Sequence, residues 1–63
     1  MIVEFTNSGG GKFAVNVDHI VMVRAGAAGH VYIDFSTGNS MVVRESYKEA
    51  LAIWESAHVD FRL

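Results

Sequence analysis

The stretch from Met41 to Trp54 most constrains the fold, because a short apolar strand there runs directly into a capped helix. Its first three residues are apolar, and two of them are β-branched, as is typical of strands. Ser46 is followed three residues later by Glu49, which forms the S-x-x-E capping box. In this motif each residue's side chain accepts a hydrogen bond from the other's backbone amide. The sequence therefore predicts a helix that begins immediately after Ser46.

The predicted helix carries an apolar stripe that should pack on a sheet. Tyr47, Ala50, Leu51 and Trp54 recur at the spacing of one helical face. We expect both aromatic side chains, Tyr47 and Trp54, to pack in the core, with Trp54 at its centre. The alternative is that these two aromatic side chains contact a partner. The predicted core consists of Ile33, Phe35, Leu51 and Trp54.

The length of the chain, 63 residues, predicts a single small domain over residues 1–63. A chain this short is marginally stable alone and usually needs a disulfide, a metal or a partner. The sequence contains no cysteine, which excludes disulfides and thiolate metal sites. Hydrophobic residues make up 51% of the chain. A domain this small cannot bury so many hydrophobic side chains in its own interior, so we expect some of them to be buried between chains. The composition therefore predicts a homo-oligomer.

The charge of the chain argues against general binding to nucleic acid or to anionic membranes. The formal net charge is −2 and the isoelectric point is about 5.8. No apolar run approaches the roughly 20 residues of a membrane-spanning helix, so no membrane insertion is expected. The first residues lack the pattern of a secretory signal. Together with the absence of cysteine, these features predict a cytoplasmic location.

The remaining segments alternate short apolar runs with turns rich in Gly, Asn and Ser. We expect a hairpin first and then three antiparallel strands, the first of which should lie centrally because it is almost continuously apolar. The predicted fold class is α+β: a small antiparallel β-meander of about five or six short strands with one C-terminal amphipathic helix packed on it. The five strands before the helix are predicted at Ile2–Phe5, Lys12–Val15, Ile20–Ala25, His30–Phe35 and Ser40–Val43.

The end of the chain has the alternation of a further strand. Val59, Phe61 and Leu63 alternate with Asp60 and Arg62. We hypothesise that this segment pairs with a sheet edge of its own or of a neighbouring subunit, so that its three apolar residues contribute to self-association.

The sequence shows no arrangement that predicts catalysis. The three histidines lie in different predicted elements, and no serine has the context of an activated nucleophile. The run Gly9-Gly10-Gly11-Lys12 superficially suggests a phosphate-binding loop, but no helix follows it, so a hairpin turn is the better interpretation. We therefore expect no catalytic, cofactor-binding or metal-binding residues, and not an enzyme.

Two arginines on predicted strands support a different function. Arg24 and Arg44, with nearby aromatic residues, are typical of a β surface that holds a single nucleic-acid strand. The strand–turn–strand rhythm also looks like that of the longer and more basic LytTR-type DNA-binding domains. A nucleic-acid-binding regulatory module is thus the alternative hypothesis.

One set of residues between positions 16 and 54 carries a family resemblance: Asn16, Asp18, Ile20, Ile33, Thr37-Gly38, Val42, Val43 and Glu45-Ser46. Through these residues the stretch 16–54 resembles the FlbD/SwrD-like family of small bacterial flagellar-motility proteins. This resemblance implies a non-catalytic role in flagellar motility and no catalytic residues. We therefore expect a self-associating protein-interaction module whose partners include its own copies and another protein.

Overall fold

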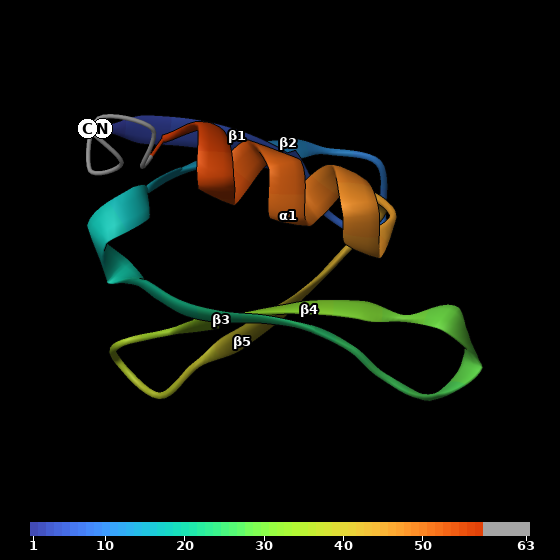
Figure 1. Ribbon diagram of the computed structural model, residues 1–63. Coiled ribbons are helices and arrows are strands. Elements are labelled where there is room, and N and C mark those ends of the chain that lie inside the picture. Colours follow the sequence, from blue (N-terminus) through green and yellow to red (C-terminus); the bar gives the residue numbers. More distant parts are fainter. Residues whose placement is uncertain (58–63) are drawn as a thin grey trace.

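The computed structural model describes residues 1–57, which form five antiparallel strands in two sheets and one helix (Figure 1). This confirms the predicted α+β class. Single 3₁₀ turns at Val17–His19 and Ala27–Gly29 connect β2 to β3 and β3 to β4. The elements are β1 (Ile2–Thr6), β2 (Lys12–Asn16), β3 (Ile20–Ala25), β4 (Val31–Phe35), β5 (Ser40–Val43) and α1 (Tyr47–Ser56).

The strands form a two-stranded hairpin, β1–β2, and a separate three-stranded sheet in the order β3-β4-β5. The prediction that the strand at Ile20–Ala25 is central was wrong, because β4 occupies the middle of its sheet. Short connections place consecutive strands side by side, so the middle strand in the sequence is also the middle one in space. A register shift between Ile20 and Met22 adds one residue, Val21, to the edge strand.

The two sheets meet at one corner, where the ends of β1 and β5 come together. Asn7 forms an isolated antiparallel bridge with Val43, and the amide of Arg44 donates to the carbonyl oxygen of Thr6 at 2.8 Å. The Glu45 carboxylate then accepts three hydrogen bonds from Thr6, two from its amide at 3.0 Å each and one from Oγ1 at 2.9 Å. These contacts join the hairpin to the segment between β5 and α1.

The core lies between the two sheets, with α1 packed against β3 and β1 (Figure 1). The prediction that Trp54 is its central residue was wrong, because Phe5 and Ile33 are the largest fully buried side chains. The helix contributes the small Ala50 to the buried set, which allows its backbone to approach the strands closely. The buried side chains are Phe5, Val17, Ile20, Val23, Val31, Ile33, Val43 and Ala50.

The other predicted core residues lie nearer the surface. Phe35 and Trp54 are partly buried and pack against the core, and Leu51 is also only partly buried. Tyr47 is exposed, so the prediction that it packs in the core was wrong. A single helix that crosses two small sheets can bury only the narrow strip of its surface that faces both of them. The apolar stripe is therefore wider than the part of the helix that the sheets cover.

The capping box has the geometry expected from the sequence. The Glu49 amide donates to Ser46 Oγ at 3.1 Å, and the Ser46 amide donates to Glu49 Oε1 at 2.9 Å. Two amides at the start of α1 are thereby satisfied. The predicted self-association segment, with Val59, Phe61 and Leu63, lies outside the described residues.

Candidate functional site

The candidate site is the face of the three-stranded sheet that points away from α1 and the hairpin (Figure 1). Along each strand, side chains alternate between the two faces of the sheet. Val23, Ile33 and their buried neighbours occupy the inner face, and the residues between them occupy the opposite face. We call this second set the outer face; it consists of Met22, Arg24, Tyr32, Asp34, Ser40 and Val42.

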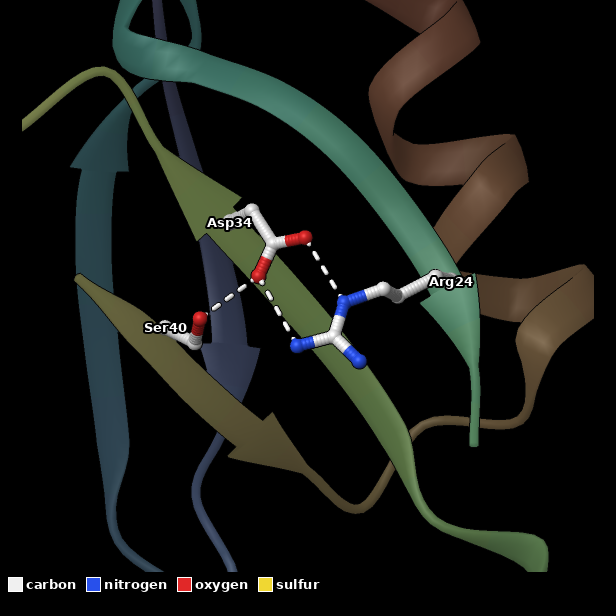
Figure 2. Close-up of polar contacts among 3 residues, drawn as sticks. All are labelled: Arg24, Asp34 and Ser40. Atoms are coloured by element: carbon white, nitrogen blue, oxygen red, sulfur yellow. Dashed lines mark hydrogen bonds and ion pairs between the residues drawn. The ribbon is translucent and has the colours of Figure 1, made fainter. Parts of the chain in front are cut away.

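Three polar side chains of the outer face form one cluster, centred on Asp34 (Figure 2). Arg24 donates from Nε to Asp34 Oδ2 at 2.8 Å and from Nη2 to Oδ1 at 3.3 Å. Ser40 Oγ donates to the same Oδ1 atom at 2.6 Å. The three residues come from β3, β4 and β5, so the cluster spans the whole sheet. Only 18% of the Asp34 side chain is exposed, against 45% of Arg24.

An aromatic contact lies beside this cluster. The Arg24 guanidinium carbon lies 4.4 Å from the centre of the Tyr32 ring, a cation–π distance. Arg24 and Tyr32 are directly opposite each other in the β3–β4 register. The His30 and Tyr32 rings also form a T-shaped pair, with 6.3 Å between the ring centres. Arg24 is therefore held by a carboxylate and an aromatic ring at once.

The electrostatics of the cluster favour a permanent ion pair. Hydrogen bonds from Arg24 and then from Ser40 lower the pKa of Asp34 below its ordinary value. The hydrogen bond to Asp34 raises the pKa of Arg24. Both groups therefore stay charged at neutral pH, and their charges cancel. Since the other four residues of the outer face are uncharged, the face as a whole is neutral at that pH.

Apolar side chains border the polar cluster. Val21 is 55% exposed and Met22 is 49% exposed, both at the irregular start of β3. Val42 on β5 is partly buried and lies opposite Tyr32. Val23, between Met22 and Arg24, is buried because it belongs to the inner face. The outer face is thus a neutral surface with an apolar margin.

The second predicted nucleic-acid contact, Arg44, lies elsewhere and is also engaged. Its Nε donates to the carbonyl oxygen of Ser8 in the β1–β2 loop at 3.2 Å. In that loop the amides of Gly9 and Gly11 both donate to Asn7 Oδ1, at 2.9 and 3.0 Å. Amides that already have an intramolecular acceptor are poorly placed to bind a phosphate. The loop therefore has the arrangement of a closed hairpin turn.

A serine–histidine pair of the kind found in nucleophilic catalysis was not predicted from the sequence. His19 Nδ1 and Ser36 Oγ lie 3.2 Å apart, and both residues are exposed. The Ser36 amide also donates to the His19 carbonyl oxygen at 2.8 Å. A serine–histidine pair needs a third group that orients the histidine and a water-poor site to act on a substrate. Because both residues are exposed to water, the pair lacks the water-poor site that catalysis needs. We therefore interpret the hydrogen bond as a structural link between two turns.

The described residues contain neither a candidate metal centre nor a membrane span. Within residues 1–57, no group of three His, Asp or Glu side chains could hold a metal ion. In the same range, no helix is long and apolar enough to cross a membrane. Comparison with family models, curated proteins and solved structures gave no match for this chain.

The structure separates the predicted site residues and adds new ones. Arg24 and Arg44 were expected on one β surface, but they contact different parts of the chain, Asp34 and the β1–β2 loop. Asp34, Ser40 and Tyr32 were not predicted as site residues. The alternation of residues 30–35 does place Tyr32 and Asp34 on one strand face. Only the register between strands shows that Arg24 and Ser40 lie next to them.

Proposed function

We propose that this protein is a non-catalytic, self-associating interaction module of the cytoplasm that serves flagellar motility as an accessory protein. The observation that carries the self-association is a mismatch between composition and burial. Hydrophobic residues are 51% of the 63-residue chain, yet among the 57 described residues eight hydrophobic side chains are buried and seven more are only partly buried against the core. Among the large apolar side chains that stay exposed are Ile2, Val21 and Met22. Covering such surface with a second copy is favourable by about 25 cal/mol per Å² of apolar area.

The flagellar part of the proposal is supported by the sequence resemblance over residues 16–54. The structure places these residues from the end of β2 to α1, so they include the outer face and the capped helix. An accessory role without catalysis is compatible with a surface whose polar groups are already paired with one another.

The test of self-association is the molar mass of the full-length chain in solution. We expect sedimentation equilibrium to give a mass at or above twice 6.9 kDa at micromolar concentration, decreasing on dilution. A mass of one chain at every concentration would contradict the proposal.

For the flagellar role, deletion of the gene in its own host should reduce swimming in soft agar, and the intact gene should restore it. Normal swimming in the deletion strain would contradict the proposed role in flagellar motility.

The alternative, a nucleic-acid-binding regulatory module, is favoured by one observation. Arg24 lies over the Tyr32 ring, and a cation beside an aromatic ring is a common platform for an unstacked base. Asp34 opposes this function because it already neutralises the guanidinium. Binding of a labelled single-stranded oligonucleotide that weakens steeply with salt, and is lost in Arg24→Ala, would favour the alternative. No binding at low salt would exclude it.

A further inference from the structure

We infer that the outer face is the surface through which two copies of this chain associate, each outer face covering the other about a two-fold axis. This inference rests on the proposed self-association and identifies the surface that carries it. Tyr32, Met22 and Val42 are the apolar anchors of the contact. The Arg24–Asp34–Ser40 cluster makes the same surface electrically neutral.

The first argument concerns charge. A charged side chain can be covered by another protein only if it keeps a partner, because an unpaired buried charge is strongly unfavourable. On the outer face each chain supplies its own pair, Arg24 Nε to Asp34 Oδ2 at 2.8 Å. Asp34 also accepts a hydrogen bond from Ser40 Oγ. The carboxylate therefore keeps its hydrogen bonds when another protein covers it. A second copy, which is equally neutral there, is therefore electrostatically acceptable.

The same argument disfavours charged partners. An acidic protein or a nucleic acid would gain little from a guanidinium whose charge Asp34 already neutralises, and it would bring its own negative charge close to that carboxylate. A basic partner would compete with Arg24 for that carboxylate. A self-complementary neutral face avoids both conflicts, since two-fold symmetry brings identical patches together.

The second argument concerns the residue types. Tyr, Met and Arg are enriched in the centres of protein–protein interfaces, where Tyr and Arg often carry much of the binding energy. The outer face presents one of each, with Tyr32 in the middle strand and Met22 and Arg24 on the neighbouring edge strand. The ring of Tyr32 is fixed by Arg24 at 4.4 Å, so little side-chain freedom remains to be lost on association.

The exposed face of the hairpin offers a useful contrast. Ile2 is 64% exposed there, more than Met22, but Glu4 and Lys12 on the same sheet are exposed charges. Within residues 1–57 the structure shows no ion pair between those two side chains. Among the described residues neither Glu4 nor Lys12 forms an ion pair, so a copy placed on this face would cover two charges without the close pairing that Arg24 and Asp34 have. The hairpin is therefore the matched control surface.

The decisive experiment compares Met22→Lys with Ile2→Lys in the full-length chain. Each variant adds one positive charge at an exposed apolar site, one on the outer face and one on the hairpin. We expect Met22→Lys to weaken self-association at least tenfold in sedimentation equilibrium, and Ile2→Lys to match the wild type. Circular dichroism should show the same fold for all three proteins. Equal association of the two variants with the wild type would overturn the inference while leaving self-association intact.

A second series tests the role of the ion pair without adding charge to an apolar site. Arg24→Ala and Asp34→Ala each leave one charge of the pair without its partner, so each should weaken association by tenfold or more. The double variant Arg24→Ala/Asp34→Ala removes both charges and should associate more strongly than either single variant. Single variants that associate like the wild type would overturn the inference. A wild-type chain that is monomeric throughout would instead refute the proposed function itself.

Discussion

Asp34 and Glu45 are two carboxylates that each accept three hydrogen bonds, but they connect very different parts of the chain. Glu45 binds Thr6, which lies 39 positions away in the sequence and belongs to the other sheet. Asp34 binds Arg24 and Ser40, which lie on strands already paired with its own by backbone hydrogen bonds. The Glu45 contact therefore helps to hold the fold together, whereas the Asp34 contact adds little to a sheet that is already formed.

This difference shows how to distinguish a structural carboxylate from one that serves a surface. The Glu45 side chain adds to the two backbone contacts that join the hairpin to the end of β5, so its loss weakens the connection between the two sheets. A group that lies across an existing sheet is free to serve recognition instead. The following predictions test this distinction, from the largest expected effect to the smallest.

The largest effect should come from the buried connection between the hairpin and the rest of the molecule. Phe5 is fully buried on β1 and contacts Phe13, with 6.0 Å between the ring centres. Phe5→Ala should lower the free energy of unfolding by about 3–5 kcal/mol, because it leaves a cavity in the core. Urea denaturation followed by Trp54 fluorescence measures this. Val21→Ala, at an exposed site, is the control, and an equal loss in both variants would show that β1 is not part of the central core.

Removal of the Glu45 side chain should have the next largest effect. Glu45→Ala leaves the partly buried Thr6 amide and hydroxyl without their acceptor, so we expect a loss of about 1–2 kcal/mol. Glu4→Ala removes an exposed carboxylate from the same hairpin and should change the stability little. Thermal unfolding by circular dichroism compares the two. If Glu45→Ala were as stable as Glu4→Ala, the corner contact would not hold the two sheets together.

Acid should produce a smaller loss through the same contact. Burial alone would raise the pKa of Glu45, but hydrogen bonds from Thr6 and from its own backbone amide, together with the positive charge of Lys12, bring the pKa below the ordinary 4.5. The native state therefore binds fewer protons than the unfolded state around this pH, and stability falls as the pH drops below about 4.5. The loss should be smaller than in Glu45→Ala, because a protonated carboxyl still accepts a hydrogen bond. The urea midpoints at pH 7 and pH 3.5 should differ less in Glu45→Gln than in the wild type, because the variant lacks the titrating carboxylate. An identical pH dependence in the two proteins would contradict this assignment.

The smallest effect on folding should come from Asp34. Asp34→Ala leaves an arginine whose side chain is 45% exposed, so water can solvate the freed guanidinium. We expect the unfolding midpoint to stay close to that of the wild type at concentrations where both chains are monomeric. Thermal unfolding at several dilutions separates this from any effect of association. A loss as large as that of Glu45→Ala would remove the distinction between the two carboxylates.

The sequence predicted the positions of the elements well, because local chemistry sets them. Gly- and Asn-containing turns limit the strands, and the Ser46–Glu49 pair starts the helix. The predicted strand bounds agree with the structure to within one residue. Backbone conformation at these points depends on neighbours only a few positions away, so no knowledge of the tertiary structure was needed.

The tertiary structure alone decided which residues are buried and which meet. Phe5 rather than Trp54 is central, β4 rather than β3 is the middle strand, and Glu45 meets Thr6 across 39 positions. Which residues are buried and which pair depends on contacts between segments that are far apart in the sequence. The periodicity within one segment cannot predict such contacts. The sequence by itself determined where strands and helix form, because turns and caps act locally. Only the packing of two sheets against one helix decided which side chains form the core and which form the outer face.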